Sequence, residues 1–406
     1  MPTEHATRLL IAIALSVLFG VYAGWHFGPA VSSFAWMGTL FLNALKMLIV
    51  PLILVAVISG ITAMGDIRKL GRLGTITVVY YLSTTAIAVL IGLFVVNWIE
   101  PGAGLNITPP ELPQRILDKQ NIGASDILLS LVSPNLFESM ANTQLLPVIL
   151  FAILFAAAVS TQPQTNPPVI QFFDGANDAM MRLVTWLMYL APFGIFALVA
   201  NRLGQAGGGP AFWLEIEAVF WHMVTVISGL AIHFFVLLGI LLWVGRRGLD
   251  YLRSLARALL TAFGTASSSA TLPLTLECIK ESGVDKRSTR FVVPLGATIN
   301  MDGTALYEAA AVLFIAQAYG IELDLGAQVL VFITATLAAI GAAGIPEAGL
   351  VTMVIVLNAV GLPLEGIGLL LAVDWLLDRF RTTINVWGDA VGAAVVERFL
   401  PKDKTA

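Results

Sequence analysis

Long apolar runs separated by short polar breaks dominate this chain. The first six runs cover residues 9–28, 37–62, 74–98, 144–160, 180–201 and 213–244. Four later segments are also apolar but are interrupted by Gly, Ser and Pro; they lie near 251–283, 290–318, 325–362 and 364–399. Because about 20 apolar residues in a helix cross the hydrocarbon core of a bilayer, the pattern predicts an all-α integral membrane protein with many spans.

The composition supports this interpretation. Of the 406 residues, 58% are hydrophobic and 12% are charged, whereas soluble domains carry roughly 25% charged residues. The net charge of −4 and the lack of a basic block indicate no nucleic-acid partner. The single cysteine, Cys278, excludes an intramolecular disulfide. Metal-ligand spacing is absent among the four histidines, which are His5, His26, His222 and His233.

The first apolar run is interpreted as a span and not as a signal peptide. It is longer than a typical signal-peptide core, and Gly28-Pro-Ala30 is a poor cleavage site.

Basic residues gather in a few polar breaks, at 68–72, 246–257, 280–290 and 402–404. Placing all of them in the cytoplasm satisfies the positive-inside rule and puts both termini inside. Segment 251–283 then starts and ends on the same side, so it is predicted to enter the membrane and turn back near 266–273. A second re-entrant hairpin is predicted with its tip at 341–349. The alternative is that both segments are ordinary kinked spans.

A short string after each hairpin predicts an internal repeat. Thr298-Ile-Asn300 follows the first hairpin, and Thr383-Ile-Asn385 follows the second. Irregular backbone at membrane depth is tolerated only inside protein or around a cavity. Two hairpin tips and two matching spans therefore predict inverted repeats that meet at one cavity near the membrane midplane.

One face of the last apolar segment is polar. Its polar residues, which share a helical face of about 100°, are Asp374, Asp378, Arg381, Thr382, Asn385 and Asp389. Charged side chains are costly in hydrocarbon, so this face must look into protein or water. The segment is therefore predicted to form a binding site.

The side-chain types indicate the ligand. Arg381 offers a planar fork of donors that matches a carboxylate, with Asp374 placed to orient it, and Asp378 suits an ammonium group. The tip Ser267-Ser-Ser269 offers hydroxyl and backbone N–H groups for a second carboxylate. We therefore predict a site for an amino acid with an acidic side chain. A purely structural pair between Arg381 and Asp374 or Asp378 is the alternative, disfavoured because buried pairs often fail to offset their desolvation.

Hard oxygen ligands surround a predicted break in the preceding span. Asn300, Asp302 and Thr304 lie at the break, and Asp389 ends the polar face. Carboxylates and free carbonyl groups suit a bare alkali ion; alternatively, Asp302 caps a helix. Glu308 lies in an apolar run, where burial favours a protonated carboxyl group, so it is either a proton carrier or a structural hydrogen-bond partner.

At these residues the sequence resembles the glutamate transporter family, the dicarboxylate/amino acid:cation symporters, which includes the excitatory amino acid transporters and prokaryotic homologues. The resemblance spans nearly the whole chain. Its four ordered motifs are Ser267-Ser-Ser-Ala-Thr-Leu-Pro273, Asn300-Met-Asp-Gly-Thr304, Gly344-Ile-Pro-Glu-Ala-Gly349 and the run from Asp374 to Asp389.

The resemblance implies a homotrimer with eight spans and two re-entrant hairpins in each protomer. Residues 1–65 and 102–210 (spans 1, 2, 4 and 5) would form a scaffold. Residues 66–101 (span 3) and 211–399 (span 6, hairpin 1, span 7, hairpin 2 and span 8) would form a transport domain that moves like an elevator, and 400–406 a cytoplasmic tail. The implied activity is not enzymatic: it is sodium-coupled symport of L-aspartate or L-glutamate across a plasma membrane. The compact loops favour a prokaryotic inner membrane.

The resemblance also implies which residues bind. Arg381 would hold the substrate side-chain carboxylate and Asp378 its amino group, with Asp374 in support. The rest of the pocket and its gate would be formed by Thr382, Asn385, Ser268, Thr304, Ile345 and Gly349. Sodium would be held at one site by Asp389 and carbonyl groups of Gly296, Asn300 and Asn385. Further sodium ligands would be Thr298, Met301 and the carbonyl groups of Ala339, Ile340 and Ala342 at a second site, and Tyr81, Thr84, Thr85, Asn300 and Asp302 at a third.

Two details resemble the animal proteins more than the archaeal ones. Glu308 follows Tyr307 where the archaeal pattern has glutamine, and Arg379 accompanies Ala266 where the archaeal arginine is on the hairpin tip. The matching animal glutamate is tied to proton cotransport and potassium countertransport, which makes H+ symport with K+ antiport a hypothesis here. Glu347 departs from the animal pattern, which usually has glutamine. Arg379 projects away from the binding face, so we expect a snorkelling or interdomain side chain.

Three alternatives change the function. The same fold could carry C4-dicarboxylates or neutral amino acids, or be purely proton-coupled, but Arg381 together with Asp378 favours acidic amino acids. An intramembrane protease is disfavoured because Asp374 and Asp378 lie one turn apart on one helix, whereas an aspartyl dyad needs facing carboxylates about 3 Å apart. No histidine is placed by sequence to activate Ser268. An ion channel would not concentrate its substrate against a gradient.

Overall fold

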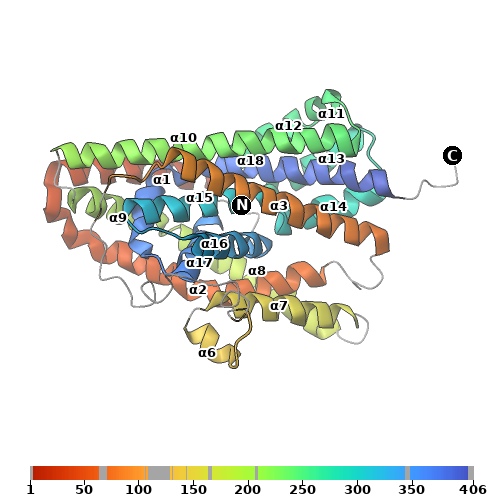
Figure 1. The fold of residues 1–406 in the computed structure, drawn as a ribbon, viewed down its shortest axis with the longest axis horizontal. Helices are drawn as coiled ribbons and strands as arrows, with labels where there is room; N and C mark the ends of the chain where they lie inside the picture. Colours follow the sequence, from red (N-terminus) through yellow and green to blue (C-terminus); the bar gives the residue numbers. More distant parts are fainter. Residues whose placement is uncertain are drawn as a thin grey trace.

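The structure, a computed structural model, describes residues 3–63, 71–105, 107, 129, 131–142, 144–162, 167–205, 209–342 and 348–400. The described residues form helices and no strands (Figure 1), which confirms the predicted all-α class. Four helical stretches are long and apolar enough to cross a membrane, and the bent pair of helices at 167–205 counts as a fifth if it is one span. These stretches are Ile11–Thr62, Gly71–Ile99, Phe212–Gly245 and Lys286–Ala318. The first contains 52 residues, enough for two crossings.

A first group of helices comes from the N-terminal half of the chain. It comprises α1 (Thr3–Phe27), the 3-10 helix η1 (Gly28–Phe34), α2 (Ala35–Thr62), α6 (Leu136–Ala141), α7 (Leu145–Ser160), α8 (Pro167–Met188) and α9 (Ala191–Gln205). Helix α1 packs along α9, and α2 packs along α7, α8 and α9. Glycines permit this close packing: a Cβ atom on Gly24 would lie 2.9 Å from the carbonyl oxygen of Ala200.

A second helix group contains α3 and the rest of the chain from α10 onwards. Its long helices are α3 (Gly71–Ile99), α10 (Gly209–Ile240) with a π-helical end η2 (Leu241–Gly245), and α18 (Ile367–Phe399). Its shorter elements are α11 (Leu249–Ser254), α12 (Ala256–Thr265), α13 (Ser268–Glu281), α14 (Lys286–Ile299), α15 (Asp302–Ala318), α16 (Leu325–Ala338), η3 (Ala339–Gly341), α17 (Ala348–Val360) and η4 (Leu364–Gly366). Helix α18 packs against α10, α14 and α15, and α3 packs against α15 and α10.

Helices α12 and α13 form a hairpin at the predicted position. The chain turns at Ala266, which has a left-handed conformation (φ +49°), and Ser267 then caps α13 by accepting a hydrogen bond of 3.1 Å from the Ala270 amide. The guanidinium of Arg379 on α18 donates two 2.8 Å hydrogen bonds to the carbonyl groups of Phe263 and Gly264 at the end of α12. Arg379 thus ties this hairpin to α18, which differs from the snorkelling or interdomain contact we expected.

Helices α16 and α17 pack against each other as a second hairpin. Residues 343–347, which include most of its predicted tip, lie outside the described residues. The two hairpins lie towards opposite ends of the long helices, α12 and α13 towards the end where α18 finishes (Figure 1).

The predicted break in the span before the second hairpin is present. Helix α14 ends at Ile299 and α15 starts at Asp302, while Asn300 (φ −114°, ψ 77°) and Met301 (φ −106°, ψ 57°) are not helical. The matching string on α18 behaves differently, because α18 runs unbroken through Asn385 from Ile367 to Phe399. The repeated string Thr-Ile-Asn therefore coincides with a break in only one of the two spans.

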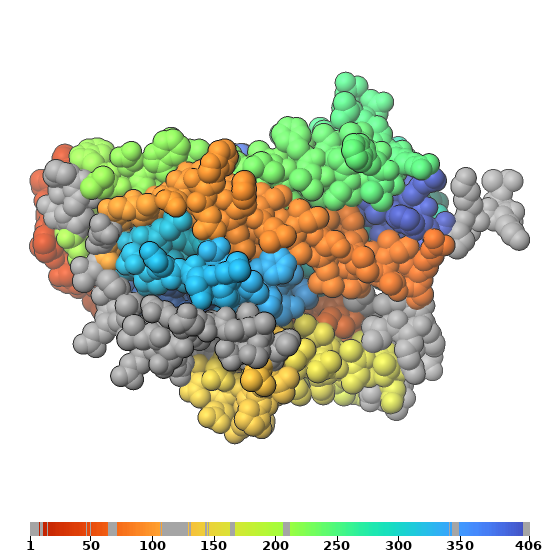
Figure 2. Space-filling view, viewed as in Figure 1, coloured from red at the N-terminus to blue at the C-terminus, as the bar shows by residue number. Residues whose placement is uncertain are grey.

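The two helix groups meet through the second hairpin and through contacts of α18 with α9 and α1. Helix α2 contacts α17, η3 and α14, and α7 contacts α16 and α17. The first hairpin packs on α14 and α18, and its outer face is open: Leu260 on α12 is 73% exposed. Figure 2 shows the green segment that contains α11 and α12 standing out from the surface.

Candidate functional site

Arg381 is the centre of a buried charge cluster on α18. Its side chain is fully buried, its Nη1 lies 3.0 Å from Oδ1 of Asp374, and its Nη2 donates a 2.9 Å hydrogen bond to Oδ1 of Asp378. These three residues are spaced by four and three positions, so they share one helix face. The ring of Tyr307 on α15 lies under the guanidinium, 4.0 Å from its central carbon, and adds a cation–π contact.

Two acidic side chains face the Arg381 guanidinium in this cluster, and the three residues are each at most 6% exposed. An ammonium group of a ligand could bind Asp378, and a carboxylate of the ligand could replace Asp378 beside Arg381. The arrangement can therefore bind a zwitterion that carries an additional carboxylate.

Asn385 links the polar face of α18 to the break before α15. Its Oδ1 accepts a 2.8 Å hydrogen bond from the Gly303 amide, and its Nδ2 donates to the Thr304 hydroxyl (3.2 Å) and towards the Met301 sulfur (3.2 Å). Gly303 allows this approach, since a Cβ atom there would lie 2.5 Å from the Arg381 carbonyl oxygen. The free amide of the first turn of α15 is thus satisfied from α18.

Both hairpins border the Arg381 cluster. A Cβ atom on Gly349, near the start of α17, would lie 2.7 Å from Nη1 of Arg381, so the second hairpin covers the guanidinium directly. The first hairpin contacts α18 along α12 and α13, with Ser268 buried in the first turn of α13. Thr382 is also buried on α18. Ile345, the other predicted gate residue, lies outside the described residues.

A second polar cluster surrounds Asp302 at the start of α15. Oδ1 of Asp302 accepts hydrogen bonds from the Thr85 hydroxyl (2.7 Å) and from the Thr84 hydroxyl (3.3 Å), and Thr84 also reaches Oδ1 of Asn300 (3.4 Å). The carbonyl oxygen of Tyr81 also accepts a hydrogen bond from the Thr84 hydroxyl (3.2 Å), so all five residues predicted for the third sodium site are in contact. The Asp302 carboxylate accepts hydrogen bonds from side chains of α3 and not from backbone amides at a helix end. The alternative interpretation of Asp302 as a helix cap is therefore not observed.

His233 on α10 is a member of this cluster that the sequence analysis missed. Its Nε2 lies 3.0 Å from Oδ2 of Asp302, and both side chains are completely buried. Nothing in the spacing of the four histidines indicated this contact. The only available sign was a histidine within a membrane-length apolar helix, where polar side chains usually have a partner.

Asp389 lies beside the same break. Its Oδ1 accepts a 3.1 Å hydrogen bond from Nδ2 of Asn300, and Gly296 on α14 is so close that any Cβ atom there would collide with this carboxylate. The Tyr81 hydroxyl donates a 2.5 Å hydrogen bond to the Val292 carbonyl, next to Gly296 and Asp389, while the Tyr81 carbonyl accepts a 3.2 Å hydrogen bond from the Thr84 hydroxyl. Asn300 thus joins the Asp302 and Asp389 clusters.

The other predicted sodium ligands lie at the contact between α14 and the second hairpin. Ala339 and Ile340 belong to η3, Ala342 follows it, and η3 packs on α14. Met301 is buried, whereas Thr298 is exposed and its hydroxyl donates to the Leu295 carbonyl (2.8 Å). Among the described residues, no three His, Cys, Asp or Glu side chains converge on one point. Hard, largely neutral oxygen donors of this kind suit an alkali ion.

Glu308 is buried on α15, one residue after Tyr307. Neither of its carboxyl oxygens has a hydrogen-bond partner with good geometry among the described residues, and Thr352 on α17 is the neighbouring polar side chain.

The helical architecture and the buried charge clusters define a multi-pass membrane protein with a polar site enclosed among its helices. A family model for the sodium:dicarboxylate symporter family matches residues 6–399. This chain belongs to that family.

Named relatives support this assignment. An excitatory amino acid transporter of Caenorhabditis elegans is 39% identical over 98% of this chain and 89% of its own length. Excitatory amino acid transporter 3 of Mus musculus is 37% identical over 97% of this chain and 84% of its own length. Excitatory amino acid transporter 5 of Homo sapiens is 36% identical over 97% of this chain and 82% of its own length.

Proposed function

We propose that this protein is a sodium-coupled symporter that carries acidic amino acids across a cell membrane. The observation that carries the proposal is the buried cluster of Arg381 between Asp374 and Asp378, enclosed by two helical hairpins. Membership of a sodium:dicarboxylate symporter family and the names of the relatives agree with it.

Substrate binding exchanges the partners of this cluster. The side-chain carboxylate of aspartate or glutamate takes the place of Asp378 at Arg381, and Asp378 then binds the substrate ammonium group. Asp374 stays at Nη1 of Arg381 and keeps the guanidinium oriented. Ser268, Thr304, Thr382 and Asn385 complete the pocket, and the hairpin that holds Ile345 and Gly349 is its gate. A C4-dicarboxylate would leave Asp378 without a cation, which disfavours that alternative substrate.

Sodium binding stabilises the region around the break in the span. One ion is held by Thr84, Thr85, Asn300 and Asp302, close to Tyr81, and one by Asp389 with carbonyl groups of Gly296, Asn300 and Asn385. A third is held where Met301 and Thr298 meet the carbonyl groups of Ala339, Ile340 and Ala342. Because Asn385 belongs to a proposed sodium site and also binds Gly303 beside the Arg381 backbone, sodium binding organises the substrate site.

The second helix group moves against the first as an elevator, within a homotrimer whose termini are cytoplasmic. With the basic segments in the cytoplasm, the open first hairpin faces inwards and the second hairpin is covered by α2 and α7. This arrangement corresponds to an inward-facing state. A bacterial inner membrane is the proposed location.

Uptake into proteoliposomes tests the function. We expect radiolabelled L-aspartate and L-glutamate to accumulate against their gradients when an inward Na+ gradient is applied, and not when Na+ is replaced by choline. Accumulation of succinate but of neither amino acid would contradict the proposed substrate. Accumulation driven by a proton gradient in the absence of Na+ would contradict the proposed coupling ion.

Glu308 provides a test of proton and potassium coupling. If Glu308 binds the proton that accompanies the substrate, wild-type uptake falls as the external pH rises and increases with internal K+. We expect Glu308→Gln to remove both dependences, because glutamine mimics only the protonated carboxyl group. Exchange of internal for external aspartate should persist in this variant, because exchange does not require the substrate-free second helix group to move back across the membrane. Unchanged dependence of uptake on pH and K+ would exclude Glu308 from coupling.

A further inference from the structure

A buried ion pair joins the two helix groups. Nη2 of Arg202, near the end of α9, lies 2.7 Å from Oε1 of Glu215, near the start of α10. The two side chains are only 15% and 8% exposed. Helix α9 belongs to the first group through its contacts with α1 and α2, and α10 belongs to the second through α3 and α18.

Glycines lie at two other contacts between the groups. A Cβ atom on Gly60 of α2 would lie 3.2 Å from Cγ2 of Ile299 on α14, and one on Gly368 of α18 would lie 3.5 Å from the carbonyl oxygen of Leu198 on α9. Of the hydrogen bonds and ion pairs that the described residues make with one another, the Arg202–Glu215 pair alone connects the first group to the second.

The glycine contacts and the ion pair respond differently when one helix group slides past the other. Apolar and glycine surfaces exchange one neighbour for another at little cost. An ion pair is directional, and separating it in a site withdrawn from water leaves two uncompensated charges. Nε of Arg202 and Oε2 of Glu215 have no hydrogen-bond partner among the described residues.

We propose that Arg202 and Glu215 form a latch that holds the two helix groups in the arrangement seen here and opens each time they move. The latch rests on the proposed transport function, because it regulates the movement that carries the substrate. Alternatively, the pair could only stabilise the short connection between α9 and α10. Both residues would then move together, and the pair would not affect the movement of the two helix groups.

Cross-linking separates these two cases. Arg202→Cys and Glu215→Cys are introduced together into a Cys278→Ala background, and the new thiols are oxidised to a disulfide in proteoliposomes. Completion is measured as loss of maleimide labelling. We expect uptake of aspartate to fall to background when the disulfide forms and to return when dithiothreitol reduces it. Normal uptake by the fully oxidised protein would overturn the latch. Uptake by the wild-type protein tests the transport function separately, so the two failures are distinguishable.

Charge variants test the latch without cross-linking. We expect Glu215→Gln to change the maximal uptake rate by about fivefold or more, a coupling of the size usual between linked conformational states. The exchanged pair Arg202→Glu with Glu215→Arg should restore the rate to within about twofold, because the attraction is preserved. Failure of the exchanged pair to restore a rate that both single changes alter would contradict an ion-pair latch.

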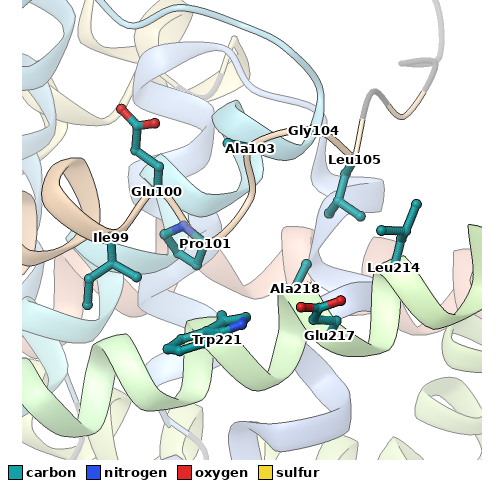
Figure 3. Close-up of a pocket in the computed structure, with 10 residues that line it drawn as sticks. All are labelled: Ile99, Glu100, Pro101, Ala103, Gly104, Leu105, Leu214, Glu217, Ala218 and Trp221. Carbon is teal, nitrogen blue, oxygen red and sulfur yellow. The ribbon is translucent and has the colours of Figure 1, made fainter.

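Glu217 offers a matched control on the same helix. It lies two residues after Glu215, on a different face, and lines an open cavity of about 370 Å³ between the end of α3 and the start of α10, together with Glu100 and Trp221 (Figure 3). Glu217→Gln removes the same charge without touching the pair, and we expect the uptake rate to stay unchanged. Equal effects of Glu215→Gln and Glu217→Gln would mean that the rate follows surface charge and not the latch.

Discussion

Replacing Arg381 with glutamine is expected to abolish uptake of aspartate and glutamate. The change removes the guanidinium that contacts both Asp374 and Asp378 in the buried cluster. Truncating one partner of a buried, hydrogen-bonded charge pair costs about 2–5 kcal/mol, which corresponds to a loss of roughly 30-fold to several thousand-fold in uptake at limiting substrate. Initial uptake rates over a range of aspartate concentrations measure this loss.

Two comparisons distinguish a lost binding site from an unfolded protein. Asp378 can still bind an ammonium group in the Arg381→Gln variant, so we expect a neutral amino acid such as L-serine to be carried at least as well as by the wild type. Arg253→Gln serves as the matched control, because Arg253 forms an exposed pair with Asp250 at the surface and its loss should leave uptake unchanged. Aspartate uptake at the wild-type level by Arg381→Gln would refute the assigned role.

The sequence allowed the Arg381 cluster to be predicted because its members lie on one helix. Helical periodicity alone puts Asp374, Asp378 and Arg381 on one face, and the cost of charge in hydrocarbon turns that face inwards. The turn at Ala266 and the break at Asn300 were predictable for similar local reasons, from small residues and from polar residues in an apolar run.

Contacts between distant helices could not be predicted in this way. His233 reaches Asp302 across 69 positions of the chain, and Arg379 reaches the end of α12 across 116. Periodicity gives the direction in which a side chain points on its own helix, but it contains no information about which helix lies opposite. The same limit explains why the Arg202–Glu215 pair was not noticed.

The repeated string Thr-Ile-Asn shows how local similarity can mislead about backbone geometry. Asn300 lies in the break between α14 and α15, while Asn385 lies inside the continuous α18 and donates to and accepts from the start of α15. The two amides thus act on the same break from opposite sides. An identical string therefore predicted proximity to the site but not the conformation of its own helix.

Replacing Asp302 with asparagine is expected to weaken the coupling of uptake to sodium. The substitution preserves size but removes the one formal negative charge that Thr84, Thr85 and His233 surround. An alkali ion bound by otherwise neutral oxygen atoms loses most of its electrostatic attraction. We expect the Na+ concentration for half-maximal uptake to rise by about tenfold or more, with a less steep dependence on Na+, as measured by uptake at saturating aspartate over a range of Na+ concentrations.

Variants of His233 distinguish whether the sodium dependence of uptake follows from the charge of the Asp302 carboxylate or from its position. If Nε2 of His233 donates to Oδ2 of Asp302, it holds the other oxygen towards Thr84 and Thr85. Glutamine at position 233 keeps an N–H donor, so His233→Gln should raise the half-maximal Na+ concentration less than His233→Leu, which leaves the buried carboxylate without this donor. Asp250→Asn, an exposed change on α11, should have no effect on the sodium dependence. If Asp302→Asn matched that control, the cluster around Asp302 would not be a sodium site, and the coupling ion would have to be held by Asp389 and the second hairpin alone.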